Sequence, residues 1–98
     1  MKSILKSLYQ YSRNKEIKDL IFGAFNKDYG IRQQVADNQN APKYILEKLS
    51  NDEDYFVRMY VAKNKNTPKS TLEKLSNDED YFVRYWTSKN PNFIDKKL

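Results

Sequence analysis

The sequence predicts an all-α fold built as a short stack of two-helix units, each about 26 residues long. Two observations lead to this prediction. A run of 13 residues at positions 46–58 recurs unchanged at 72–84, and the whole units 41–66 and 67–92 match at 18 of 26 positions. Each copy also contains leucines at helical spacing and two helix-start signals. Because one such pair cannot cover its own apolar face, neighbouring units must stack.

Residues 1–27 precede the repeat and predict a helical hairpin that caps one end of the stack. Two apolar stripes at helical spacing are separated by a polar break at residues 12–14. The first stripe holds Ile4, Leu5, Leu8 and Tyr9, and the second holds Ile17, Leu20, Ile21 and Phe25.

The 26-residue offset also extends in both directions from the two whole units. Residues 28–40 form a half repeat, in which Asp28 and Arg32 align with Asp54 and Arg58. Residues 93–98 form a C-terminal stub, a thin cap that leaves room for pairing with a second copy. We therefore expect one domain over residues 1–98, divided into 1–27, 28–40, 41–66, 67–92 and 93–98.

Within each unit, two local signals predict where helices begin. Thr67 and Pro68 are expected to serve as N-cap and first residue of a short helix. Ser76 with Glu79 forms a capping-box pattern that predicts the start of a second helix, which ends before Pro91. The earlier unit repeats this pattern with Ser50.

The repeated string Asn-x-Asn-Thr-Pro-x-x-x-Leu-x-x-Leu-x-x-Asp-x-Asp-x-x-Val-Arg resembles the leucine-rich repeat variant, a relative of HEAT-like helical repeats. The matching residues are Asp28, Ile31, Arg32, Val35, Ala36 and Asn38; then Pro42, Leu46, Leu49, Asp52, Asp54, Val57, Arg58, Val61, Ala62 and Asn64; then Asn66, Thr67, Pro68, Leu72, Leu75, Asp78, Asp80, Val83, Arg84 and Asn90. The resemblance implies a right-handed solenoid of alternating α and short 3-10 helices. It implies no particular function, since such repeats are scaffolds for many partners.

Composition argues against enzymatic chemistry. The chain has no cysteine and no histidine, so thiol nucleophiles, cysteine-bound metal or iron–sulfur centres and the usual neutral-pH acid–base group are missing. We expect no enzyme activity, no cofactor and no metal. No apolar run reaches membrane-spanning length and no signal peptide is evident, so a cytoplasmic location is expected. The abundance of lysine, asparagine, isoleucine and tyrosine is typical of A+T-rich bacterial or phage genomes.

Eight large side chains occupy positions that the resembled family tends to keep polar. One interpretation is that they pack between successive units. The other is a repeated protein-binding face, with Tyr60 and Trp86 as its best anchors, because exposed aromatic clusters mark interfaces. The residues are Tyr55, Phe56, Met59, Tyr60, Tyr81, Phe82, Tyr85 and Trp86.

Three aspartate–arginine pairs recur in register, each four residues apart along a helix. We expect a structural ladder of ion pairs and caps, with a phosphate-binding ladder as the alternative. The pairs are Asp28 with Arg32, Asp54 with Arg58, and Asp80 with Arg84.

The net charge of +5 raises nucleic acid as a partner. Lys63, Lys65, Lys69 and Lys89 lie near expected helix ends, where they either offset helix dipoles or form a basic edge along a phosphate backbone. Residues 1–40 carry +3, whereas the two whole units carry only +1 and the stub +1. The leading prediction is therefore a non-enzymatic module that binds another protein. The alternative is a nucleic-acid-associated protein, including one of phage or mobile-element origin that docks on and inhibits a nucleic-acid enzyme.

Overall fold

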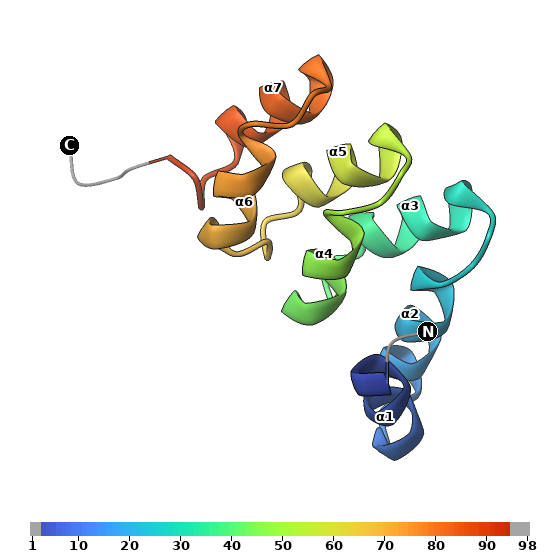
Figure 1. Ribbon diagram of the computed structural model, residues 1–98. Coiled ribbons are helices and arrows are strands. Elements are labelled where there is room, and N and C mark those ends of the chain that lie inside the picture. The colour runs from blue at the N-terminus through green and yellow to red at the C-terminus, as the bar shows by residue number, and fades with distance from the viewer. Residues whose placement is uncertain (1–2, 95–98) are drawn as a thin grey trace.

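The computed structural model describes residues 3–94 and contains seven α-helices and no strand in that range (Figure 1). The helices are α1 (Ser3–Tyr11), α2 (Lys15–Ala24), α3 (Tyr29–Asp37), α4 (Lys43–Leu49), α5 (Tyr55–Lys63), α6 (Lys69–Leu75) and α7 (Tyr81–Lys89). The predicted all-α class is confirmed. Residues 95–98 of the predicted stub lie outside the described residues.

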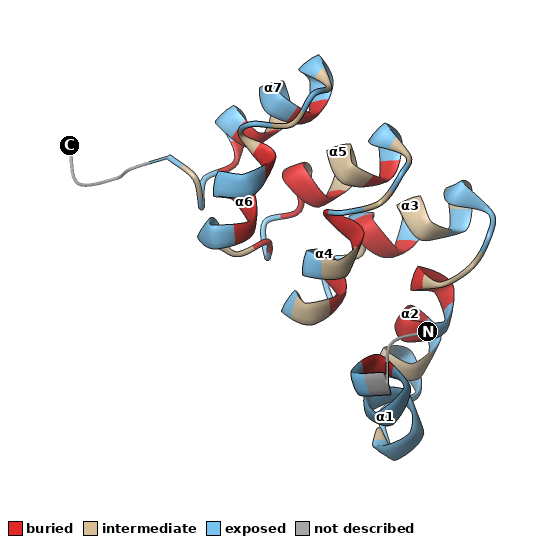
Figure 2. Cartoon of the chain, in the orientation of Figure 1, coloured by how far each residue is buried: buried red, intermediate tan, exposed pale blue. Residues whose placement is uncertain are grey.

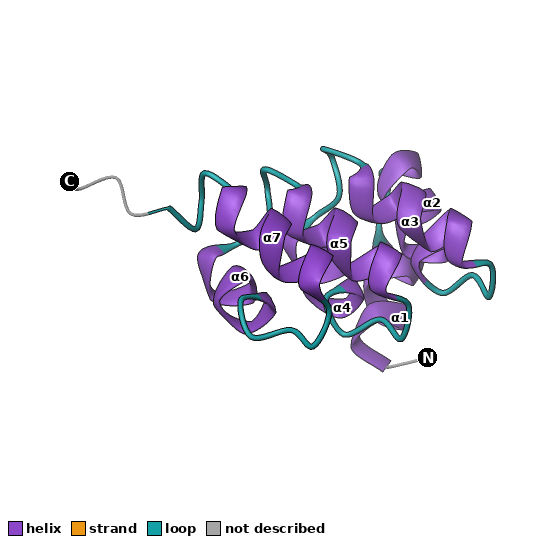
Figure 3. Ribbon diagram, turned by 90° about the horizontal axis from the view of Figure 1, so that it is seen from above, coloured by secondary structure: helices purple, strands orange, loops and turns teal. Residues whose placement is uncertain are grey.

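Helices α3, α5 and α7 are the nine-residue helices of the repeated units and are called the long helices below. They lie side by side in one row, and α4 and α6 lie behind them (Figure 3). The most extensive helix contacts join α3 to α5 and α5 to α7. Helices α4 and α6 pack on α5 and α7, respectively, and α2 packs on both α3 and α4. The Cα radius of gyration is 13.3 Å, close to the roughly 13 Å of a compact domain of this size.

The three long helices begin at equivalent aspartates. Asp28, Asp54 and Asp80 are N-caps whose carboxylates accept hydrogen bonds from the backbone N–H two residues further on, at 2.8, 2.9 and 2.8 Å. Each carboxylate satisfies a donor that has no partner within the helix and complements the helix dipole. Aspartate at this position is therefore sufficient to fix where the helix starts.

The predicted capping box is wrong. Ser50 and Ser76 are C-caps of the short helices α4 and α6, and each hydroxyl donates to a carbonyl three residues back, Glu47 and Glu73, at 2.6 Å. The long helix starts only at the residue after the aspartate N-cap, several residues later than predicted. Serine in this sequence context hydrogen-bonds backward and ends one helix instead of opening the next.

The start of the short helices also differs from the prediction. Pro42 and Pro68 occupy the N-cap, not the first helical position, and the Thr67 hydroxyl donates to the Val61 carbonyl at 2.7 Å. Thr67 is fully buried, so its side chain ties the inter-helix turn to the preceding helix instead of capping the next one. Both short helices are α-helical, not the 3-10 helices that the resemblance implied.

The apolar core follows the interior of this arrangement, as the buried ribbon segments in Figure 2 show. Its fully buried residues include Ile21, Ile45, Leu46, Leu49, Val57, Val61, Leu72 and Val83. Gly23 allows α2 to pack closely against α3, because a Cβ at this position would lie only 2.8 Å from Val35 Cγ2 on α3. The absence of a side chain at this position therefore sets how tightly α2 packs on the first long helix.

Buried asparagines join α5 to α3 and α7 to α5. Asn64 donates from Nδ2 to the carbonyls of Ala36 and Asn38 at 2.8 and 2.9 Å. Twenty-six residues later, Asn90 donates to the carbonyls of Ala62 and Asn64 at 2.7 and 2.9 Å. The acceptors belong to the last turn and C-cap of the preceding helix, where carbonyls lack intrahelical partners. One side chain thus caps the C-terminus of its neighbour.

None of the helices in the described part of the chain is both long and apolar enough to cross a bilayer.

Candidate protein-interaction surfaces

The arginines of α3 and α5 form ion pairs between units, not within one helix. Arg32 binds Asp52 through Nε and Nη2 at 2.8 and 3.1 Å, and Arg58 binds Asp78 through the same atoms at the same distances. The predicted four-residue pairing is wrong, because Asp28 and Asp54 are committed to capping.

Both ion pairs are largely shielded from solvent. The Arg58 and Asp78 side chains are 11% and 10% exposed, and the Arg32 and Asp52 side chains 11% and 6%. Hydrogen bonding to the partner carboxylate raises the pKa of Arg32 and Arg58 above the ordinary value. The predicted structural role of these two arginines fits this geometry, whereas a phosphate-binding role would require their guanidinium groups to be accessible.

Arg84 has the same sequence context but a different environment. Its Nη1 donates to the Asp78 carbonyl at 2.6 Å, as Arg58 Nη1 does to the Asp52 carbonyl at 2.7 Å. Within residues 3–94 Arg84 has no carboxylate partner, and its side chain is exposed. Its predicted partner, Asp80, caps α7.

The eight predicted aromatic and methionine positions separate into two groups. Five are exposed on the outer side of α5 and α7, and the exposure rises from 37% at Phe56 to 52% at Phe82 and 62% at Tyr81. We call these five residues the aromatic face: Tyr55, Phe56, Tyr81, Phe82 and Tyr85. The other three, Met59, Tyr60 and Trp86, are half-buried and pack against the core.

Within each of the two helices, neighbouring rings of the aromatic face contact one another. Tyr55 stacks on Phe56 at 4.5 Å between ring centroids, and Tyr81 stacks on Tyr85 at 6.4 Å. Phe56 also reaches Tyr29 of α3 at 6.4 Å, so the exposed rings continue onto the preceding helix. These contacts limit the rotamers of the rings, so less side-chain entropy would be lost on binding.

Tyr60 and Trp86 differ from the prediction that made them the best anchors. The Lys63 ammonium lies 4.8 Å from the Tyr60 ring centroid and 4.5 Å from that of Trp86, between two successive long helices. A cation over both ring faces is a cation–π arrangement, and it covers the surface that an anchor would present. The exposed rings of α7 are better placed to contact a partner.

The four predicted lysines have different environments. Lys63 and Lys89 lie in the last turn of α5 and α7, where a cation offsets the helix dipole, and Lys89 also lies 5.5 Å from the Tyr85 ring centroid. Lys65 lies exposed in the turn between α5 and α6. Lys69 is the exposed first residue of α6, so the dipole explanation does not apply to it.

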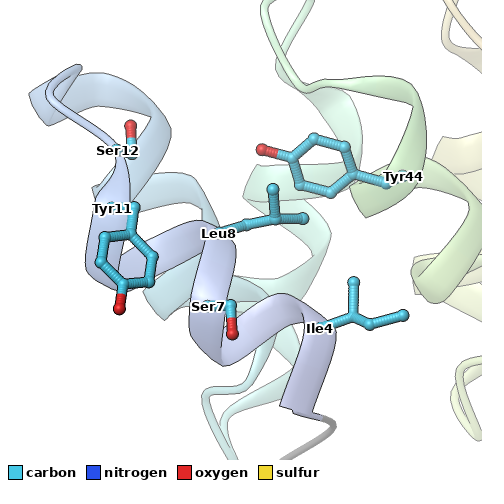
Figure 4. A pocket seen from close by; sticks show the side chains of 6 residues that line it. All are labelled: Ile4, Ser7, Leu8, Tyr11, Ser12 and Tyr44. Atoms are coloured by element: carbon cyan, nitrogen blue, oxygen red, sulfur yellow. The ribbon is translucent and has the colours of Figure 1, made fainter.

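A second apolar surface, which the sequence did not single out, lies between α1 and α4 (Figure 4). It is an open groove of about 520 Å³ lined by Ile4, Ser7, Leu8, Tyr11, Ser12 and Tyr44. Leu8 points toward the Tyr44 ring, while Ile4 and Tyr11 are 73% and 77% exposed at its margins. Ile4 and Leu8 belong to the first apolar stripe predicted for the N-terminal hairpin, and in the structure Ile4 is mostly exposed and Leu8 is 37% exposed.

The described residues contain no group of three or more acidic side chains arranged to hold a metal ion. In the same residues every buried side-chain nitrogen and oxygen has a hydrogen-bond partner. The distinctive chemistry of this part of the chain is therefore at its surface, in the exposed rings and in the Arg84 guanidinium, which the repeated pattern leaves without a carboxylate partner among residues 3–94.

Comparison of the sequence with protein-family models, with curated proteins and with solved structures finds no significant match. The resemblance to the leucine-rich repeat variant therefore rests on the quoted motif alone.

Proposed function

We propose that this chain is a short helical solenoid of the leucine-rich repeat variant type, and that it binds another protein through the aromatic face of α5 and α7. In this proposal α1 and α2 form the cap of the stack, and no step of the function is enzymatic.

Repetition of specific contacts supports the solenoid. The Arg–Asp pair and the Asn-to-carbonyl pair each occur twice at an offset of 26 residues, with distances that agree within about 0.1 Å. A repeat array is expected to show this behaviour, since each unit contacts only its neighbours through one recurring interface.

The exposure of the aromatic face carries the binding proposal. Large apolar side chains left in solvent reduce solubility unless a partner covers them, and clustered aromatic rings are enriched in the energetic centres of interfaces. Here Tyr81 and Phe82 remain 62% and 52% exposed although the core beneath them is complete. The acidic residues Glu79 and Asp80 precede these rings, and Lys89 follows them. The expected partner surface is therefore apolar, with basic groups at the edge that faces Glu79 and Asp80 and acidic groups at the edge that faces Lys89.

A double substitution tests the proposal. Phe56→Glu with Phe82→Glu places two carboxylates in the centre of the aromatic face, and both side chains are exposed enough for the fold to accept the change. A partner is first recovered with the wild-type protein from its native host, then purified and titrated against each variant. We expect the affinity to fall by about 30-fold or more, which corresponds to the loss of about 2 kcal/mol at one anchor.

The chain offers a matched control. Tyr11→Glu with Phe22→Glu introduces the same charges at two rings that are 77% and 67% exposed on α1 and α2. Circular dichroism should show both double variants to be folded. Equal binding by the folded Phe56/Phe82 variant and the wild-type protein would refute the aromatic face. Sedimentation of the wild-type protein at several concentrations tests the further prediction of a homodimer.

Nucleic-acid binding remains the second prediction. Lys65 and Lys69 are exposed and four residues apart, which permits a phosphate contact, whereas Lys63 and Lys89 lie against aromatic rings. Retention of DNA and RNA across a salt series tests it, because phosphate-driven binding is strongest at low salt. The absence of retention at low salt would exclude this function.

A further inference from the structure

The ion pairs between units show which ligand the arginine of a long helix takes. In both, the guanidinium forms three hydrogen bonds: Nε and Nη2 to the two oxygens of an aspartate, and Nη1 to a backbone carbonyl. The aspartate lies 20 residues further along the chain, so this arginine always faces the next unit. Bidentate binding of this kind suits carboxylate and phosphate groups, and the ligand in both filled sites is an aspartate carboxylate.

Arg84 is the third member of this series and keeps the part of the geometry that belongs to its own unit. The Asp78 carbonyl accepts from Nη1 at 2.6 Å, which holds the guanidinium as the Asp52 carbonyl holds that of Arg58. The edge formed by Nε and Nη2 has no carboxylate partner among residues 3–94. Part of the orientational cost of binding is thus already met before a ligand arrives.

The geometry points to a carboxylate-binding site at Arg84 on the open side of α7, and we propose that it binds an aspartate from a helix-start segment of another protein molecule. The two filled sites also specify a second contact. An asparagine 12 residues after the aspartate, as Asn90 follows Asp78, donates to two carbonyls of the preceding unit. The corresponding carbonyls at the open side belong to Ser88 and Asn90 itself.

The occupant is not the N-terminal end of a second copy. There the position equivalent to Asp52 is Asn26, which has no carboxylate, and α2 packs on the helix that would have to be exposed. The open side of α7 accepts a close neighbour, since Ser88 is a small residue at the position of the fully buried Ala62. The site is independent of the aromatic face, so either proposal can fail alone.

Nuclear magnetic resonance of the ¹⁵N-labelled chain of residues 1–98 tests the site directly, because this chain has only four arginines and each gives one Nε–Hε resonance. The probe is a capped peptide with the sequence of residues 76–90, the segment that places Asp78 on Arg58 in the intact chain. We expect a saturable shift of the Arg84 resonance and none for Arg32 or Arg58. A peptide with Asp78→Asn should bind about tenfold more weakly or worse, because a charge-assisted pair becomes neutral.

A second experiment is needed because the free peptide could be too weakly helical to bind. Fusing the same segment after Leu98 through a flexible linker raises its effective concentration to about the millimolar range. If neither the free nor the fused segment moves the Arg84 resonance, or if Asp78→Asn in the probe makes no difference, the proposal is wrong.

The last control separates a partner from the chain's own carboxylates. Asp95 lies outside the described residues and is the next acidic residue after Arg84 in sequence. We expect Asp95→Asn to leave the Arg84 resonance unchanged and peptide binding intact. A shift of that resonance caused by Asp95→Asn alone would mean that the chain fills its own site, and would overturn the proposal of a partner.

Discussion

Substitution of Asn64 by alanine tests the contact that joins α3 to α5. The Asn64 side chain is 1% exposed and makes three hydrogen bonds. Its Nδ2 donates to Ala36 and Asn38, and its Oδ1 accepts from the Asn66 N–H at 2.8 Å. Alanine removes all three bonds: the Ala36 carbonyl loses the Asn64 donor, and the Asn38 carbonyl keeps only the Ala41 N–H at 3.0 Å.

The expected loss is about 3 kcal/mol in the free energy of unfolding, at about 1 kcal/mol for each net hydrogen bond. For a urea m-value of about 1–3 kcal/mol/M, this lowers the unfolding midpoint by about 1 M or more. Asn64→Asp should cost at least as much, because it places a carboxylate against two carbonyl oxygens and supplies no donor. This variant conserves the side-chain shape, removes the Nδ2 donor and adds a negative charge.

Asn38 provides the matched control, since it occupies the equivalent position one unit earlier. Its Oδ1 accepts from the Asn40 N–H at 2.7 Å, but within residues 3–94 its Nδ2 donates no hydrogen bond. Asn38→Ala should therefore cost only about 1 kcal/mol. Urea unfolding followed by far-ultraviolet circular dichroism and by Trp86 fluorescence measures both variants. Equal destabilisation by Asn38→Ala and Asn64→Ala would refute the argument, because it would place the energy in the turn and not between units.

Two further predictions concern charged groups. A double-mutant cycle of Arg58→Gln and Asp78→Asn, followed by urea unfolding, should give a coupling energy of about 1–3 kcal/mol. The same cycle for the exposed pair Lys15 and Asp19 should give no measurable coupling. Equal coupling energies for the two pairs would contradict the role of burial. Burial lowers the pKa of Lys48 below its ordinary 10.5, so the native state binds fewer protons than the unfolded chain between the two pKa values. The free energy of unfolding of the wild type, measured relative to that of Lys48→Met, should therefore rise with pH across that window. A difference that does not change with pH would contradict the assignment to Lys48.

The helices could be predicted from the sequence because their signals are local. Each apolar stripe and each aspartate or proline lies within a few residues of the backbone that it governs. The helix boundaries were harder to predict. Ser76 with Glu79 fits a capping box as a pattern, but the Ser76 hydroxyl has a competing acceptor in Glu73 only 2.6 Å away. A pattern search cannot weigh those two hydrogen bonds, since both are compatible with the same letters.

The ion-pair partners could not be predicted for a different reason. In a sequence that repeats every 26 residues, Arg58 has an aspartate four residues before it and another 20 residues after it, and both recur in register. Periodicity therefore supports pairing within a helix and pairing between units equally well. The structure decides between them because the Asp54 carboxylate is used as an N-cap, which leaves Asp78 to meet the guanidinium. The asparagines carried a usable signal, since Asn38, Asn64 and Asn90 share the same offset.

The differences between the two whole units show how a repeated interface becomes an open surface. The second unit has Thr71, Thr87 and Ser88 where the first has Ile45, Val61 and Ala62. The hydroxyls of Thr87 and Ser88 donate to carbonyls of their own helix, Val83 at 2.8 Å and Tyr85 at 2.6 Å. These replacements lower the apolar area of the last unit without leaving unsatisfied polar groups. The rings of α7 show the opposite trend. Tyr85 replaces Met59, and Tyr81 and Phe82 are more exposed than the equivalent Tyr55 and Phe56 of α5. A unit that only needed solubility would have lost these rings together with the aliphatic side chains, and their retention is the strongest argument that a partner covers them.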